Sequence, residues 1–196
     1  MKKIFLFFII FLLFSGLPAR VFAADYTSQY PPEYNGTYVK ATSYLNDAYL
    51  PKFSCDPSEP LIGTITENQW LSAGAQPQRF HIDLGSSKII TRIYYENSMM
   101  DTHDEWARVG VKNFTFWGSN DGASFSELTY ATDTGWISIT ASETHFEKHV
   151  LLAQPDPYYI TVTNSTAYRY YAFKFDDTYT TGEWVGVRRI ELQSGG

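Results

Sequence analysis

The sequence contains a single cysteine, Cys55, among its 196 residues. An intramolecular disulfide is therefore excluded, although an exported chain is free to form disulfides. We expect Cys55 to be a free or buried thiol, because neither Lys52 nor Asp56 nearby gives it a clear means of activation. Side-chain packing must then supply the stability that disulfides give to many exported domains.

Basic residues are also scarce. The 15 Lys and Arg residues are outnumbered by 21 Asp and Glu residues, which gives a net charge of −6. Nucleic-acid binding requires clustered Lys and Arg that neutralise phosphates, and binding to an anionic membrane surface depends on the same sign of charge. We expect no nucleic-acid partner, and the charge disfavours a lipid ligand.

Long apolar runs are absent except at the N-terminus. Lys2 and Lys3 precede the apolar run 4–14, and small residues follow it up to Ala23. This order is typical of a secretory signal peptide over residues 1–23. The run is about half as long as the ~20 residues that a membrane-spanning helix needs. We therefore expect a secreted chain that begins at Ala24 or Asp25, with neither a membrane span nor a lipid anchor.

Helical periodicity is hard to find in the remaining chain. In Arg79 to Leu84, Phe80, Ile82 and Leu84 alternate with polar residues, a pattern typical of a half-buried strand. Short segments of similar composition predict about eight strands in all, at 37–44, 79–84, 88–96, 111–117, 145–151, 158–163, 168–176 and 185–193. Many short strands without intervening helices predict an all-β, antiparallel sandwich or barrel.

Turn residues and chain ends divide the sequence further. The stretch Ser119-Asn120-Asp121-Gly122 predicts a tight hairpin turn, after which Phe125 resumes a strand. We expect an irregular lead-in at 24–36, one domain at 37–193 and a flexible tail at 194–196.

Five fragments, taken together and in order, resemble the discoidin or coagulation factor 5/8 type C domains and related bacterial carbohydrate-binding modules. They are Asn68 to Ser72, Phe80 to Gly85, Val111 to Gly122, Tyr168 to Tyr170 and Arg188 to Leu192. The resemblance implies a galactose-binding-like jelly-roll β-sandwich. Members of this class bind galactose-type sugars, other glycans, phospholipid head groups or protein receptors, so the fold does not choose the ligand.

Three of these fragments also predict structural roles. Asp83 precedes Gly85 at the point where a strand gives way to a turn, and its carboxylate can accept the amide hydrogens of that turn. Trp70, Ile190 and Leu192 are large apolar residues at strand positions, which are typically core.

No metal site or cofactor is predicted. Many sugar-binding members of the resembled family hold calcium through an Asp-Gly-Asn loop before the Trp, but Gly63 stands where the carboxylate is expected, and only Glu67 and Glu191 are obvious oxygen ligands. His145 and His149 would lie about 13 Å apart on a strand, too far to share one ion. We expect both histidines to be on the surface.

Two long loops carry the candidate ligand-binding residues, and the resemblance places both toward the ligand-binding end of the fold. Asn97 to Gly110 combines an aromatic ring with hydrogen-bonding groups, and Asp177 to Trp184 adds two more rings. Sugar recognition needs that mixture, because a ring stacks on the C–H face of a pyranose while polar groups bind its hydroxyls. The predicted site consists of Asn97, Asp101, His103, Trp106, Arg108, Tyr179 and Trp184, with Trp106 as the main platform. The alternative is that Trp106 and Trp184 cap the core.

These observations predict a secreted, non-catalytic module whose partner is a glycan or glycoconjugate. A protein-adhesion or assembly domain of a larger exported or virion-associated protein, with a protein receptor as partner, is the alternative. A lipid-binding module would need basic residues that the chain lacks. A hydrolase is less favoured because no acid/base pair can be assigned roles.

Overall fold

Ten strands form one curled sheet in the computed structural model, which describes residues 25–62, 66–74, 77–99, 103–180 and 184–195. The strand order is β1-β10-β5-β8-β7-β6-β9-β4-β2, and β3 pairs with β10 beside this path. Every pair of named strands is antiparallel. This arrangement confirms the predicted antiparallel β-sandwich.

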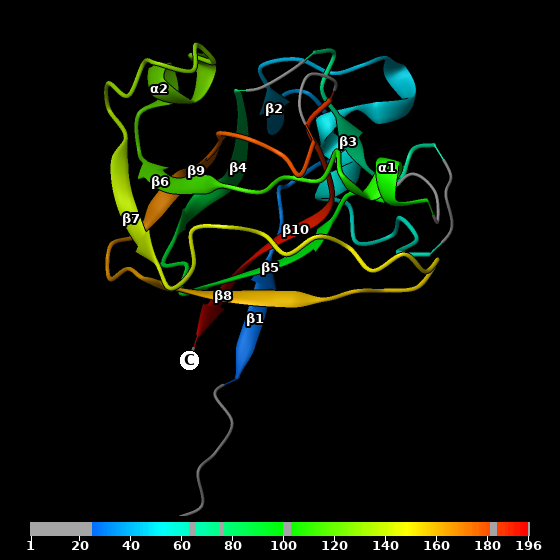
Figure 1. The fold of residues 1–196 in the computed structure, drawn as a ribbon. Helices are drawn as coiled ribbons and strands as arrows, with labels where there is room; N and C mark the ends of the chain where they lie inside the picture. Colours follow the sequence, from blue (N-terminus) through cyan, green and yellow to red (C-terminus); the bar gives the residue numbers. More distant parts are fainter. Residues whose placement is uncertain (1–24, 63–65, 75–76, 100–102, 181–183, 196) are drawn as a thin grey trace, which may run out of the picture.

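The two halves of the curled sheet make the two layers of the sandwich (Figure 1). The first layer contains β1 (Tyr26–Gln29), β10 (Gly186–Gly195), β3 (Trp70–Leu71), β5 (Arg92–Asn97) and β8 (Tyr158–Thr163). The second contains β7 (Ile137–Ala141), β6 (Phe114–Ser119), β9 (Tyr168–Phe175), β4 (Gln78–Lys88) and β2 (Val39–Ala41). The pairing of Thr140 with Thr163 and of Ala141 with Val162 joins β7 to β8. Within the described residues, four short helices lie outside the strands: η1 (Asp47–Tyr49), η2 (Pro51–Ser54), α1 (Asp104–Ala107) and α2 (Gly122–Ser126).

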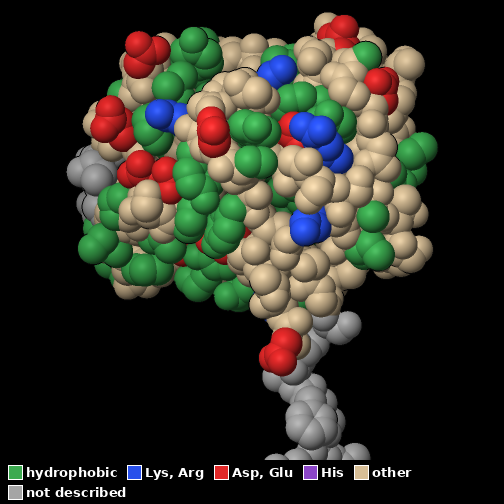
Figure 2. All heavy atoms as spheres, turned by 180° about the vertical axis from the view of Figure 1, so that it is seen from behind, with side chains coloured by type: hydrophobic (Ala, Val, Ile, Leu, Met, Phe, Trp, Pro, Cys, Tyr) green, Lys and Arg blue, Asp and Glu red, His purple; other side chains and the backbone are tan. Residues whose placement is uncertain are grey.

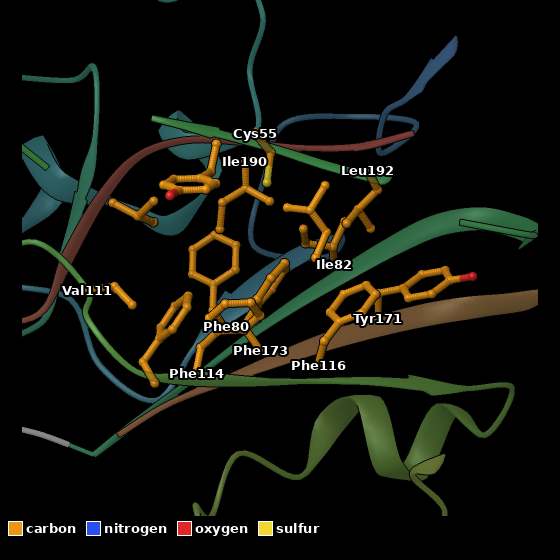
Figure 3. Packing of buried hydrophobic residues seen from close by; sticks show 14 of the residues in the cluster. Cys55, Phe80, Ile82, Val111, Phe114, Phe116, Tyr171, Phe173, Ile190 and Leu192 are labelled. Atoms are coloured by element: carbon orange, nitrogen blue, oxygen red, sulfur yellow. The ribbon is translucent and has the colours of Figure 1, made fainter. Parts of the chain in front are cut away.

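The core between the layers is built largely from aromatic side chains. Figure 3 shows the rings of Phe80, Phe116 and Phe173 gathered between the strands. Phe80 lies opposite Phe173 in the β4–β9 register, and its ring is 5.2 Å from that of Trp70. Such cross-strand aromatic pairs stabilise a sheet beyond the area they bury. Trp70, Ile190 and Leu192 are buried, which confirms their predicted core roles.

Residues 78–84 of strand β4 are buried on both faces, whereas a half-buried strand was expected. His81, on the face away from the main core, lies 4.8 Å from the Trp136 ring and its Nδ1 is 3.0 Å from the Phe125 carbonyl oxygen. Phe125 belongs to α2, and it packs with Trp136 and Tyr170 in a second buried cluster. Helix α2 and its neighbours therefore cover the face that alternation assigned to solvent.

The hairpin predicted at Ser119 to Gly122 is wrong. The Asp121 carboxylate accepts hydrogen bonds from the main-chain amides of Ala123 and Ser124 and so caps the N-terminus of α2. Asp and Asn occur both in hairpin turns and at helix N-termini, so the same residues fit either structure. Burial of Phe125 against Tyr170, with ring centroids 4.9 Å apart, favours the helix.

Other segments also differ from the expectations. Part of the expected irregular lead-in forms β1, because its main chain pairs with residues 192–195 of β10, which include part of the expected flexible tail. Within the described chain, residues 145–151 form no strand, and His145 makes only an isolated bridge to Asn113. His149 is buried, contrary to the expected surface position, and its Nδ1 lies 2.6 Å from the Val150 carbonyl oxygen.

Asp83 has the predicted turn role and an unpredicted partner. Its carboxylate accepts a 2.7 Å hydrogen bond from the Gly85 amide, and both oxygens accept 2.8 Å hydrogen bonds from the Arg169 guanidinium. Gly85 has φ of +72°, a conformation that favours glycine. The Asp83 carboxylate thus stabilises the turn at Gly85 and connects β4 to Arg169 of β9.

Cys55 is a free, buried thiol, as expected. Burial raises the pKa of this thiol well above its ordinary value, so it stays protonated. Residues 1–23, the predicted signal peptide, lie outside the described residues. Among the residues that the structure describes, no helix has the length and apolar character needed to cross a membrane.

Candidate functional site

The two long loops predicted to carry the site meet at one place. Gly110 at the end of the first loop forms a bridge with Gly186, just after the second loop, and Val111 forms a bridge with Thr178. The amide of Gly186 donates to the carbonyl oxygen of Val109 at 2.9 Å. We use the name apical loop cluster for the residues gathered around this contact. They are α1 with Arg108, Lys112, segments 145–148 and 177–180, and Trp184.

Asn97 holds the base of this cluster together. It is 1% exposed, and its amide nitrogen donates to the carbonyl oxygens of Val111 at 2.7 Å and Glu147 at 2.8 Å. Its amide oxygen accepts from the Ser98 main chain at 2.9 Å. A Cβ at Gly110 would lie 2.7 Å from this oxygen, so glycine is required there. Asn97 was predicted to contact the ligand, but in this structure its side chain is occupied by the main chain it positions.

A charged triad connects α1 to segment 145–148. The Asp104 carboxylate accepts a 2.5 Å hydrogen bond from Lys148 Nζ and pairs at 2.5 Å with the Arg108 guanidinium. The hydrogen bond from Lys148, followed by the charge of Arg108, lowers the pKa of Asp104 below its ordinary value. Asp104 therefore stays ionised at neutral pH and orients both cations. Such exposed pairs contribute little to stability but fix the positions of donors.

Tyr179 contributes a half-buried ring to the cluster. Its hydroxyl donates a 2.5 Å hydrogen bond to the Phe146 carbonyl oxygen, and Lys112 Nζ lies 5.9 Å from its ring centroid. Burial, followed by the charge of Glu147, raises the pKa of Tyr179. The hydroxyl is therefore protonated, and the ring is held in one orientation.

The other residues predicted for the site lie on the same loops. His103 is exposed and immediately precedes α1, Arg108 is exposed at its C-terminal end, and Trp184 is half-buried. Trp106 belongs to α1, but its side chain lies outside what the structure describes, as does Asp101 altogether. The structure therefore brings together the loops on which these residues lie.

Sequence reasoning missed three polar residues of the cluster. The predicted site included none of Asp104, Lys112 and Lys148. Lys148 lies in a segment far from both long loops in sequence, so only the pairing of residues 112–114 with 144–146 brings it near. No local pattern in the sequence carries that information.

The segment before Trp70, where the family resemblance implies calcium, is held by arginines. Buried Arg188 donates to the carbonyl oxygens of Leu61 at 3.1 Å and Met99 at 2.5 Å, and buried Arg189 donates to that of Glu59 at 2.7 Å. Calcium takes six or more oxygen ligands, including carboxylates, and is repelled by adjacent guanidinium groups. Among the described residues, no group of three or more His, Cys, Asp or Glu side chains is placed to hold a metal ion. The residues described here do not fit calcium.

Comparisons with known proteins identify the fold. No protein-family model matches the sequence, and no curated protein does. The module CpGH89CBM32-5 from Clostridium perfringens, solved with GalNAc-β-1,3-galactose, matches with a TM-score of 0.54 at 16% identity over 79% of this chain and 92% of that chain. A pectin-binding carbohydrate-binding module matches with a TM-score of 0.53 at 16% identity over 80% and 88%.

A third match comes from a longer protein. Truncated AlyQ, which has CBM32 and alginate lyase domains, matches with a TM-score of 0.55 at 16% identity over 89% of this chain and 34% of that chain. The matched structures include modules of the discoidin-like type to which the sequence fragments pointed. The chain therefore has the galactose-binding-like jelly-roll fold of the CBM32 carbohydrate-binding modules.

Proposed function

We propose that this chain is a non-catalytic carbohydrate-binding module that is exported after removal of residues 1–23 and binds a glycan through its apical loop cluster. The observation that carries the proposal is the fold match, which spans nearly all of CpGH89CBM32-5 and of the pectin-binding module. The first of these was solved with a sugar bound and the second binds pectin, so the match supports a sugar-binding role for this chain.

The apical loop cluster offers the chemistry that sugar binding needs. Tyr179 and Trp184 are half-buried aromatic residues, and Trp106 lies in α1 of the same cluster. Arg108 and Lys112 are exposed donors, and the Asp104 carboxylate is an ionised acceptor. Rings that bind the apolar face of a pyranose, surrounded by charged groups that bind its hydroxyls, form a carbohydrate site.

Asn97 takes a positioning role in this proposal in place of direct contact. Its amide holds residues 111 and 147 at a fixed separation, and through them the segments that carry Lys112 and Lys148. A scaffold that is already rigid in the free protein reduces the entropy lost on binding.

A glycan array with the mature chain from Ala24 onward tests the proposal, followed by calorimetry on each glycan that binds. Trp106→Ala and Trp184→Ala should each weaken binding by about 1–3 kcal/mol and leave folding intact, as expected of residues that anchor a ligand. Trp117→Ala is the matched control, because Trp117 is a half-buried tryptophan of β6 in the second layer, outside the cluster. Absence of glycan binding, or equal loss with Trp117→Ala, would contradict the proposed site and favour the adhesion alternative.

A further inference from the structure

A groove separate from the apical loop cluster lies beside strand β2. It has a volume of about 240 Å³ and is lined by β2, by η2 with the loop before it, and by Leu128. No residue that lines it belongs to the apical loop cluster. Ligand pockets for drug-sized molecules occupy about 300–1,000 Å³, so this groove suits a single ring-sized group.

Two lysines give the groove a positive charge. Lys40 and Lys52 both line it, with Nζ atoms 4.6 Å from the Phe125 ring centroid and 4.9 Å from the Phe53 ring centroid, respectively. In the described part of the chain neither lysine pairs with a carboxylate, whereas Lys148 and Lys174 both do. The carboxylate of Glu59 lies within electrostatic reach of Lys52 but does not line the groove.

The surroundings make these two charges unusual. The whole chain carries a net charge of −6, and Figure 2 shows that basic side chains form only a few separate spots on the rear of the molecule. An acidic protein repels anions at long range, so an anionic ligand needs a local positive site. Lys40 and Lys52, which both line this one groove, provide it.

The rest of the lining is apolar. Tyr44 is 46% exposed, and Leu50, Pro51 and Leu128 complete the walls. An exposed tyrosine ring can stack on the C–H face of a sugar, and lysine ammonium groups pair with carboxylates, so the lining suits a sugar that carries a carboxylate. An extended acidic peptide would bind along the edge of β2, but that strand has only three residues.

We propose that this β2–η2 groove is a second carbohydrate subsite that binds a uronate, the carboxylated sugar of acidic polysaccharides. The inference rests on the proposed function in that the ligand is a glycan, but it concerns a different surface. A chain with both sites binds a polysaccharide at two points, and the lysine-lined subsite selects for negative charge on the sugar.

Calorimetry with trigalacturonate at low and high salt, compared with its methyl ester, tests the subsite. The double variant Lys40→Gln/Lys52→Gln should weaken trigalacturonate binding about tenfold or more, the loss expected for hydrogen bonds to a charged group, and should remove its salt dependence. The methyl ester should bind weakly to both proteins. Lys88→Gln is the matched control, since Lys88 lies outside both sites and has no carboxylate partner in the described part of the structure.

Two further measurements separate this proposal from the function proposed above. A neutral glycan selected by the array should bind the lysine variant with unchanged affinity and should lose affinity on Trp184→Ala. If trigalacturonate binds through the lysines while no neutral glycan binds the apical loops, the subsite stands and the apical site fails. Unchanged trigalacturonate affinity in the lysine variant overturns the subsite, as does equally tight, lysine-dependent binding of triglutamate. If trigalacturonate does not bind the unmodified protein, the subsite is likewise overturned.

Discussion

The interior of the sandwich and its apical end are held together by different interactions. In the interior, each aromatic ring contacts several others: Phe173 lies within 6.2 Å of Phe114, Phe116, Phe146 and Phe175 by ring centroids. At the apical end, a few polar side chains hold the loops by hydrogen bonds to the main chain, as Asn97 and Tyr179 do. Each ring of the interior is therefore held by several contacts, whereas the positions of the loops depend on individual hydrogen bonds.

This difference predicts how each region responds to substitution. Deleting a core ring removes many contacts and lowers the stability of the whole domain, because the strands of both layers share it. Deleting an apical hydrogen bond leaves the strands intact and changes the positions of the loops. Stability should thus report on the interior, and ligand affinity should report on the apical end.

The largest expected effect is that of Phe80→Ala. Phe80 is fully buried and contacts Trp70 and Phe175, so we expect a loss of about 3–5 kcal/mol in the free energy of unfolding. Urea unfolding measures it. Glycan affinity at a temperature where the variant is folded should not change, and a loss of affinity there would show that the two regions are coupled.

A large pH effect should come from His81, at the second buried cluster. Burial lowers the pKa of His81 from its ordinary 6.5 to about 4, so the unfolded chain takes up a proton that the folded chain refuses. This contribution is fully present above pH 6.5 and is lost as the pH falls from 6.5 toward 4, by up to about 3 kcal/mol.

The variant His81→Phe isolates this contribution. It should be less stable than the natural protein at pH 7, because the bond to the Phe125 carbonyl is lost, but its stability should fall less between pH 7 and pH 4.5. Chemical unfolding at several pH values gives both curves. Parallel curves for the two proteins would show that His81 has the same pKa in the folded and unfolded states and would contradict the lowered pKa.

At the apical end, Asn97→Ala should cost about 1–3 kcal/mol of stability, because it leaves the carbonyl oxygens of Val111 and Glu147 without their donor. Its effect on glycan affinity should be larger than that of Phe80→Ala. Asn97→Asp keeps the shape but cannot donate, so it should have a similar effect; full affinity in this variant would contradict the positioning role.

The smallest expected effect is that of Tyr179→Phe, which removes only the hydroxyl that donates to the Phe146 carbonyl oxygen. We expect a loss of about 1 kcal/mol in stability and a modest loss of glycan affinity through a less fixed ring. Tyr159→Phe is the control, since Tyr159 is 54% exposed and should leave both quantities unchanged. A larger loss in the control would place the binding surface on the first layer.

The sequence predicted the parts of the fold that depend on alternation. Phe80, Ile82 and Leu84 were assigned to the core by their spacing, and the register of β4 against β9 places them there. The capping role of Asp83 was also predictable, because a turn carboxylate needs only local main-chain amides. The discoidin-type fragments gave the jelly roll, since their order along the chain is itself a constraint on topology.

The parts that depend on long-range contacts were not predictable. Helix α2 and the hairpin share the same residues at 119–122, and only the burial of Phe125 against β9 distinguishes them. His149 was assigned to the surface because no local pattern shows that it is enclosed. In the site, the Asp104–Lys148 pair joins residues 44 positions apart, and the two arginines in place of calcium act on carbonyl groups that carry no sequence signal.

The most direct test is an NMR titration in which a glycan that binds is added to the isotope-labelled mature chain and the amide shifts are measured. We predict that the largest amide shifts fall in residues 103–112, 145–148 and 177–185, with small shifts in β4 and β9. Shifts concentrated on β5 and β8, or spread evenly over the chain, would contradict the assignment of carbohydrate binding to the apical loop cluster.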